Sequence, residues 1–313
     1  MDLAILTFFC LAAQAQTPPP IVNGTPTDEW PAVGALMLCA DEECALSCTA
    51  TLVAADWILT AAHCAEAAQA SDDARFVTGS SAQEPTRSVQ LTAWHLHPDH
   101  GTRPSGGEKV PAYDVALGQL AAPIDDISPM PLNVDAVNGS WTGGELSHVG
   151  YGITADGLDD EGLKRVARIP VASYDNYNIY SLDDDGQNVC FGDSGGPVLR
   201  HQDGFGYSVA GVSSFVFAHS NSTPCVGGGS GSARIDVSLD FIRPLADVTD
   251  NEGVEHRDTG APDTSTPDTG APDTGEPDGG GCQGCATTAP GAVWWAWGLF
   301  VVAAQRRSRM SPS

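Results

Sequence analysis

Gly192-Asp193-Ser194-Gly195-Gly196-Pro197 is the most informative stretch of this 313-residue chain. Its glycines permit a tight turn and let backbone amides approach a bound carbonyl group, which a side chain would obstruct. A serine hydroxyl is a poor nucleophile at neutral pH, so Ser194 would need a base beside it and hydrogen-bond donors for a developing oxyanion. Taken alone, the stretch could also be a glycine-rich turn without chemical function.

Candidates for the missing groups lie elsewhere in the chain. His63 and Asp114 precede Ser194, so histidine, aspartate and serine follow one another in that order. At this point the chain resembles the chymotrypsin-like (trypsin-fold) serine endopeptidases, which share this order. The resemblance implies that His63 is the general base, that Asp114 orients it with support from Ser214, and that Ser194 attacks. It also implies an oxyanion hole made by the backbone N–H groups of Gly192 and Ser194.

The resemblance extends over residues 21–246. Residues 21–24, Ile-Val-Asn-Gly, look like the mature N-terminus of the family, and residues 149–152, Val-Gly-Tyr-Gly, resemble its Gly-Trp-Gly strand with tyrosine for tryptophan. It implies an all-β fold of two six-stranded antiparallel β-barrels with a C-terminal helix, for which Leu239–Ile242 is the candidate. Strand-like runs with short turns between residues 31 and 64 agree with this fold. We therefore expect a protease domain at residues 21–247.

The nine cysteines, several at disulfide-like spacing, indicate an oxidising compartment. The resemblance implies two disulfides, one bracketing the histidine and one beside the serine. A further cysteine pair flanks an acidic turn and is expected to form a small extra disulfide. Metal binding by that pair is disfavoured, because no partner histidine or cysteine completes a tetrahedral set. The expected pairs are Cys48 with Cys64, Cys190 with Cys225, and Cys39 with Cys44.

The N-terminal residues 1–15 are predicted to be a secretory signal peptide. Residues 4–13 are almost entirely apolar, and Ala13-Gln14-Ala15 supplies a small-x-small cleavage signal. The first residues carry Asp2 and no positive side chain, which a wrongly assigned start codon would explain. A buried core helix is the alternative.

Residues 16–20 are then expected to be a short propeptide, and the protein a zymogen. In the family, cleavage before the isoleucine frees an α-amino group that pairs with the aspartate preceding the serine. Ile21 and Asp193 hold those two positions here. The bond to be cut follows Pro20 rather than lysine or arginine, so activation by a trypsin-like enzyme is not expected.

The resemblance also locates a specificity pocket. Asn188, six positions before Ser194, stands where trypsin relatives carry a carboxylate, and its neighbour is Val189. Phe215 replaces the usual tryptophan, and Val216 stands on the wall where many relatives have glycine. An unpaired guanidinium would be costly in such a pocket, so we expect small or medium uncharged residues to be preferred there. Alternatively, an acidic residue from elsewhere reaches the pocket: Asp183, Asp184 or Asp185.

Two other clusters invite metal assignments, although we expect none. The first is a histidine cluster, interpreted as a surface loop that leads toward Asp114, with a zinc site as the alternative: His95, His97 and His100. The second has the character of a calcium loop, but its spacing is not diagnostic: Asp72, Asp73 and Glu84. No cofactor is expected.

Outside the expected protease domain the composition changes. The net charge of the whole chain, −26, argues against nucleic-acid partners.

Residues 248–281 are acidic and rich in Pro, Thr and Gly with a five-residue period, which predicts a disordered linker. Residues 282–313 hold Cys282 and Cys285, an apolar segment at 293–304 and an arginine cluster. This tail resembles the C-terminal sorting tags of myxobacteria and their relatives (the MYXO-CTERM type); a zinc half-site is the disfavoured alternative.

Taken together, these features predict a serine endopeptidase that acts on protein or peptide substrates. The resemblance of the tail implies that it is secreted and anchored at the membrane or cell surface of a Gram-negative bacterium. A catalytically weak or inactive surface binding module on the same fold is the alternative, because one fold hosts unrelated functions.

Overall fold

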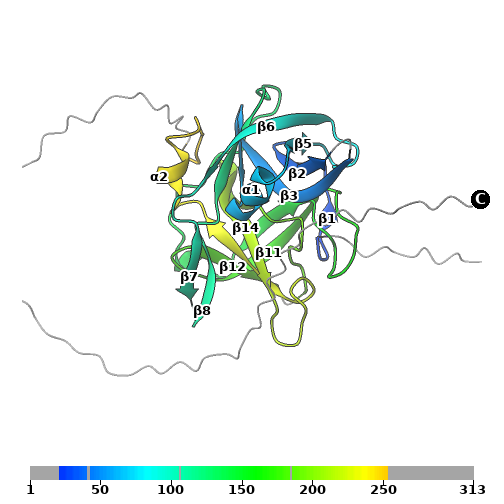
Figure 1. The fold of residues 1–313 in the computed structure, drawn as a ribbon. Helices are drawn as coiled ribbons and strands as arrows, with labels where there is room; N and C mark the ends of the chain where they lie inside the picture. The colour runs from blue at the N-terminus through cyan, green and yellow to red at the C-terminus, as the bar shows by residue number, and fades with distance from the viewer. Residues whose placement is uncertain (1–20, 41–42, 106, 184, 253–313) are drawn as a thin grey trace, which may run out of the picture. The chain divides into compact units, whose positions relative to one another are not determined.

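The computed structural model describes residues 21–40, 43–105, 107–183 and 185–252 (Figure 1). The predicted signal peptide and propeptide, nearly all of the predicted linker and the whole predicted tail lie outside these residues. Within the described part of the chain, no helix is long and apolar enough to cross a membrane.

The first barrel closes through six antiparallel strands in the order β2-β3-β4-β9-β6-β5, with β5 pairing back to β2. Its register is continuous except at bulges, such as the one between Leu36 and Met37. The strands are β2 (Val33–Ala40), β3 (Glu43–Ala54), β4 (Trp57–Thr60), β5 (Asp73–Thr78), β6 (Arg87–Leu96) and β9 (Ala116–Leu120).

The second barrel has the order β11-β10-β13-β14-β15-β12 and closes through the pairing of β11 with β12. The short β1 (Thr25–Pro26) adds to the outer side of β11. Its strands are β10 (Glu145–Gly150), β11 (Arg165–Tyr174), β12 (Asn178–Leu182), β13 (Pro197–Gln202), β14 (Gly206–Phe217) and β15 (Gly229–Arg234). The expectation of two six-stranded antiparallel barrels is confirmed.

Apolar side chains fill both barrels, as they do wherever strands alternate between an inner and an outer face. In the first barrel these side chains include Leu36, Leu52 and Phe76, all fully buried. Each buried aliphatic side chain stabilises the fold by roughly 1.5–3 kcal/mol relative to exposure. Gly34 packs against Phe76 so closely that an added Cβ would lie 2.5 Å from the ring. A glycine on β2 is therefore what allows the aromatic ring into the core.

Few elements lie outside the barrels. Helix α1 (Ala62–Gln69) follows β4, η1 (Gly139–Trp141) precedes β10, and α2 (Leu239–Ile242) is the short C-terminal helix that the resemblance implies. A hairpin of β7 (Gly101–Ser105) and β8 (Glu108–Ala112) lies between His100 and Asp114. The sequence predicted only a loop there, and it placed His95 in that loop, whereas His95 lies on strand β6.

The chain after α2 packs back onto the second barrel, so the packed body continues past residue 247, where we expected the linker to begin. Val248 and Asp250 are each about 1 % exposed. Leu132 lies beside both Val209 and Asp250 in parallel bridges. We call residues 248–251 the strap. Asn251 holds its end in place: the Asn251 Oδ1 accepts from the Val134 N–H at 2.9 Å, and its Nδ2 donates to Gln202 Oε1 at 2.8 Å.

We expect Asn251→Ala to lower the free energy of unfolding by about 0.5–1.5 kcal/mol for each hydrogen bond lost, since it removes the partners of partly buried polar groups. Urea unfolding of the full chain measures this change. Glu252→Ala is the matched control, because that neighbouring side chain is exposed and its loss should change stability by less than about 0.5 kcal/mol. Equal stability of the two variants would show that the strap does not contribute.

Candidate active site

The three predicted catalytic residues come from both barrels. His63 lies in the first turn of α1, directly after β4, and Asp114 lies just before β9, so both belong to the first barrel. Ser194 lies in the turn that leads into β13 of the second barrel. The Thr49 N–H of β3 donates to the Ser194 carbonyl at 2.8 Å, which fixes this turn against the first barrel.

Asp114 is a buried carboxylate with a full set of donors. His63 Nδ1 lies 2.7 Å from Asp114 Oδ2, and the backbone N–H of His63 donates to Oδ1 at 2.9 Å. Ser214 Oγ, on β14, donates to Oδ2 at 2.5 Å. Since a carboxylate can only accept, Nδ1 carries the proton and Nε2 of the neutral ring keeps its lone pair. The His63 side chain remains 40 % exposed, so substrate and solvent can reach it.

Burial and hydrogen bonding act in opposite directions on these two groups. Burial raises the pKa of Asp114, but the His63 charge and the bonds from His63 and Ser214 outweigh it and lower that pKa to about 2. For His63, burial lowers the pKa, whereas the charge and hydrogen bond of Asp114 raise it, and the net effect is a pKa above the ordinary 6.5. Asp114 thus stays ionised while His63 can take up a proton near neutral pH.

The turn around Ser194 depends on its glycines. Gly192 has φ 95°, and a Cβ there would lie 2.8 Å from Gly152 Cα. Gly195 has φ 82°, and a Cβ there would lie 2.1 Å from Thr60 Oγ1. Within the described part of the chain, the N–H groups of Gly192 and Ser194 donate no hydrogen bond. Both amides are therefore available to a bound oxygen atom.

Asp193 is the second fully buried carboxylate near the serine. Its Oδ1 accepts from the Gly152 N–H at 2.7 Å and its Oδ2 from the Cys190 N–H at 2.9 Å. Burial raises the pKa of Asp193 to about 7, although these two bonds and the charge of Arg165 act against it. Among the described residues no cation forms an ion pair with it.

The other member of the predicted activation pair is also in the interior. Ile21 is fully buried, and its side chain packs with Ala167 and Ile169 on β11. The Asn188 N–H donates to the Val22 carbonyl at 3.3 Å, and Asn23 Nδ2 donates to the Gly186 carbonyl at 3.1 Å. The start of the described chain is therefore inserted beside the segment that leads to Ser194.

Of the predicted pocket residues, Phe215 and Val216 lie on β14, whereas Asn188 and Val189 lie in the segment between β12 and β13. Val216 pairs with Ser230 across these strands, so each wall carries a side chain at that level. The ring of Phe215 covers Gly231 so closely that an added Cβ would lie 2.1 Å from it. Val189 is buried beside Asn188.

Asn188 is anchored at the expected pocket base. Its Nδ2 donates to the carbonyls of Pro224 at 3.0 Å and Cys225 at 3.3 Å. Its buried Oδ1 has no partner among the described residues. Asp183, an alternative for this pocket, instead accepts from the N–H groups of Asp185 and Gln187 in its own turn.

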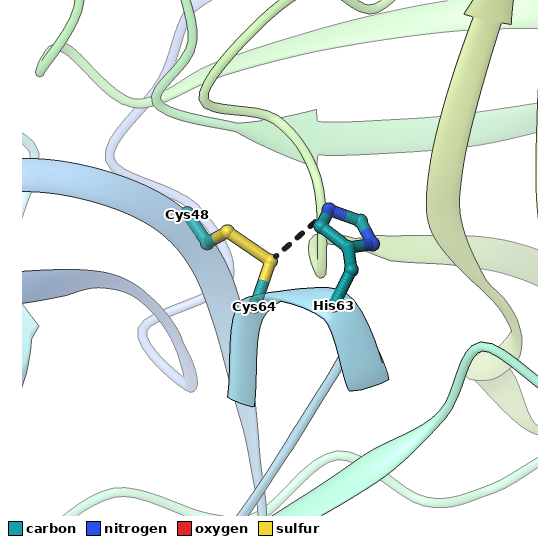
Figure 2. A group of neighbouring side chains, drawn as sticks. All are labelled: Cys48, His63 and Cys64. Carbon is teal, nitrogen blue, oxygen red and sulfur yellow. Dashed lines mark hydrogen bonds between the residues drawn. A yellow bond between two sulfur atoms is a disulfide. The ribbon is translucent and has the colours of Figure 1, made fainter. Parts of the chain in front are cut away.

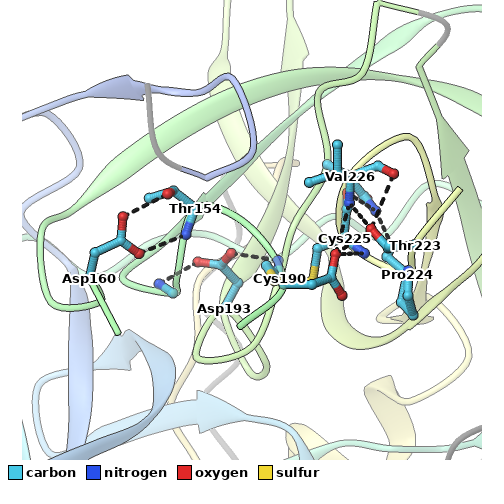
Figure 3. The surroundings of a disulfide bond; sticks show 11 residues. Thr154, Asp160, Cys190, Asp193, Thr223, Pro224, Cys225 and Val226 are labelled. Carbon is cyan, nitrogen blue, oxygen red and sulfur yellow. Dashed lines mark hydrogen bonds between the residues drawn. A yellow bond between two sulfur atoms is a disulfide. The ribbon is translucent and has the colours of Figure 1, made fainter. Parts of the chain in front are cut away.

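A tether that the sequence did not reveal joins two loops beside this site (Figure 3). Asp156 Oδ2 accepts from the hydroxyl of Thr223 and from the N–H groups of Cys225, at 3.2 Å, and Val226, at 3.3 Å. Its own loop is closed by Thr154, whose hydroxyl donates to Asp160 Oδ2 at 2.6 Å. In the sequence, Asp156-Gly157 indicates only a local turn. It does not indicate that Asp156 has a hydrogen-bond partner about 70 positions away.

Residues 21–252, apart from the gaps noted above, contain three disulfides, and these join the cysteines that we expected to pair: Cys39 with Cys44, Cys48 with Cys64, and Cys190 with Cys225. Cys48, His63 and Cys64 form the single metal-like group among the described residues, but the two sulfur atoms are bonded to each other (Figure 2). A disulfide offers no thiolate to a metal. His63 Nε2 lies 3.5 Å from Cys64 Sγ, so the disulfide packs against the ring.

The two other suggested metal clusters do not assemble in the described part of the chain. The ring of His95 packs on Trp57, with centroids 5.5 Å apart, whereas that of His97 stacks on Tyr113 at 4.4 Å. Asp73 instead forms an ion pair with Arg75 at 2.7 Å.

Two antiparallel barrels with a histidine–aspartate pair on one and a glycine-bounded serine on the other define a trypsin-like domain. The family model described as Trypsin matches residues 21–232, more than half of the chain, and the chain belongs to this family. It is also similar to an ovochymase from Halocynthia roretzi, with 29 % identity over 227 residues. That match covers 64 % of this chain but only 14 % of the ovochymase.

The raised pKa of Asp193 predicts a pH-dependent stability in protein that keeps residues 16–20. Between about pH 4 and about pH 7 the carboxyl is protonated when folded and ionised when unfolded, so the free energy of unfolding falls as pH rises. The slope from this group is at most about 1.4 kcal/mol per pH unit. Urea unfolding at several pH values measures it, and Asp193→Asn should remove this part of the slope. Identical slopes in both proteins would contradict the prediction.

Proposed function

We propose that this protein is a serine endopeptidase that hydrolyses peptide bonds through an acyl-enzyme on Ser194. The observation that carries the proposal is Asp114, which accepts hydrogen bonds on both oxygens and holds His63 with the proton on Nδ1, so that Nε2 is the basic nitrogen. Membership of the trypsin family supports the same reaction class.

In this mechanism His63 Nε2 takes the proton of the Ser194 hydroxyl as its oxygen attacks the carbonyl carbon. Asp114 stabilises the imidazolium that forms, and it stays ionised because its pKa is about 2. The free N–H groups of Gly192 and Ser194 stabilise the oxyanion. The imidazolium then protonates the leaving amine, and a water molecule, activated by His63 in the same way, hydrolyses the acyl-enzyme.

Activation in this proposal uses the pair Ile21 and Asp193. Cleavage after Pro20 would free an α-amino group on a residue whose side chain is already in the interior. A buried carboxylate without an ion pair is costly, and a nearby ammonium group offsets that cost. The pH dependence described above should then reverse, because a paired Asp193 has a depressed pKa and its stabilisation is lost as pH falls.

We further propose that the protein is secreted and held at the cell surface by its C-terminal residues. Three disulfides in the described part of the chain fit an oxidising compartment. The supporting features for the anchor are those of the sequence alone: the acidic stretch at 248–281 and the apolar segment at 293–304.

Ser194→Ala should lower kcat for peptide hydrolysis by roughly 10⁴–10⁶-fold, because the nucleophile is lost. A fluorophosphonate probe should label the wild type and not this variant. Ser88→Ala is the matched control, since Ser88 is exposed on β6 and should retain both activity and labelling. Peptide hydrolysis by Ser194→Ala at the wild-type rate would refute the mechanism.

The pocket walls predict a preference for small or medium uncharged residues before the scissile bond. Chromogenic substrates ending in Ala, Val, Leu, Phe and Arg test this order. Val216→Gly should raise kcat/KM for Phe relative to Ala by roughly 10-fold or more, because the paired wall of Val216 and Ser230 opens. Asn188→Asp is the complementary variant and should improve Arg substrates. Arg as the best of the five in the wild type would overturn the assignment.

A further inference from the structure

A second imidazole lies beside Asp114 that the mechanism above does not use. His100 Nδ1 is 3.7 Å from Asp114 Oδ1. This oxygen receives the backbone N–H of His63, whereas the His63 ring and the Ser214 hydroxyl are bonded to Oδ2. On its other side, His100 Nε2 is 3.8 Å from Glu66 Oε1 on α1. His100 thus lies between two carboxylates, one of which is Asp114.

The backbone holds His100 in this place. Its N–H donates to the His97 carbonyl at 2.9 Å, and the Asp99 N–H donates to His97 Nδ1 at 3.2 Å. The His97 ring stacks on Tyr113, the residue before Asp114, with centroids 4.4 Å apart. The turn that carries His100 is therefore packed directly against the segment that carries Asp114.

The His100 side chain is only 20 % exposed, and its Nδ1 has no hydrogen-bond partner among the described residues. At 3.7 Å the approach to Asp114 is too long for a hydrogen bond, so the two groups interact through charge. A protonated His100 would be attracted by both carboxylates at once. Its positive charge would also act on the carboxylate that stabilises the imidazolium of His63.

Titratable groups lie on several sides of His100 in the described part of the chain. Asp114 and Glu66 face its two nitrogen atoms from separate elements, and His63 lies beyond Asp114. Its own turn contributes the neighbouring side chains of His97 and Asp99. Arg103 on β7 donates to the Asp99 carbonyl at 3.1 Å, so a permanent positive charge also approaches the turn.

We propose that His100 is a positioning residue that shares Asp114 with His63, so that a proton on His100 weakens the hold of Asp114 on the imidazolium of His63. Two imidazoles that share one carboxylate take up their protons in coupled steps, because the first charge disfavours the second. His63 therefore remains an unprotonated base to lower pH than it would beside Asp114 alone. This inference rests on the proposed peptidase function for its kinetic effect, although the coupling itself does not need catalysis.

The pH profile of kcat/KM tests the proposal. His100→Gln removes the charge and keeps a polar side chain, so the pKa of the acid limb should rise by about 0.5–1 unit, as expected for charges several ångströms apart near a surface. At pH 8, above the acid limb, kcat/KM should change less than about threefold. His100→Phe, which lacks both charge and polarity, should shift the acid limb in the same direction.

A matched control is His201→Gln, because that histidine is exposed on β13 of the second barrel. It should leave the acid limb within about 0.2 units of the wild type. A purely structural role for His100 would lower thermal stability in both His100 variants without moving the acid limb, and this result would overturn the proposal.

A direct titration separates this proposal from the proposed function. In ¹⁵N-histidine-labelled Ser194→Ala protein, NMR follows His63 and His100 without turnover. We expect the His63 pKa to be higher by about 0.5–1 unit when His100→Gln is added. An unchanged His63 pKa would overturn the coupling even in a protein with full peptidase activity, whereas the expected shift in an inactive protein would leave the coupling standing and refute only the peptidase function.

Discussion

The bond from Ser214 to Asp114 is the interaction on which the candidate site depends. Asp114 belongs to the first barrel and Ser214 to β14 of the second, so this 2.5 Å bond links the two barrels beside His63. A carboxylate removed from water costs several kcal/mol unless donors replace its hydration. Asp114 has donors on both oxygens, and the requirement to supply them fixes the relative position of the two barrels locally.

Two buried carboxylates on either side of Ser194 differ only in their partners. Asp114 is hydrogen-bonded to the imidazole of His63 and has a pKa of about 2. Asp193 accepts hydrogen bonds from two backbone N–H groups and has a pKa of about 7. Burial disfavours the charged form of both, so the stronger opposing contacts at Asp114, which are the His63 charge and the hydrogen bonds from His63 and Ser214, separate the two pKa values. The first site is electrostatically complete as it stands, and the second is suited to accept one more positive group.

Sequence patterns predicted what depends on local chemistry and chain order. The barrels followed from strand-like runs together with the resemblance, and the glycines around Ser194 indicated a turn that only glycine permits. Contacts between distant loops left no such signal. The Asp156 tether spans about 70 positions, and His100 reaches Asp114 only because the unpredicted β7–β8 hairpin returns the chain. The strap at 248–251 was missed because acidic, polar residues resemble the linker that follows, although Asn251 supplies hydrogen bonds that only the folded barrel can receive.

The tether also suggests how a change at Asp193 could reach the pocket. The two N–H groups on Asp193 belong to Gly152 and Cys190, which begin the Asp156 loop and carry one half of a disulfide. Cys225, the other half, donates its own N–H to Asp156. The Asp156 loop and the Cys190–Cys225 disulfide are therefore both bonded to Asp193 and to each other. A shift of either one would strain the hydrogen bonds of the other. An ammonium group paired with the Asp193 carboxylate would therefore restrict the motion of two segments together: the turn that carries Ser194 and the segment that is hydrogen-bonded to Asn188.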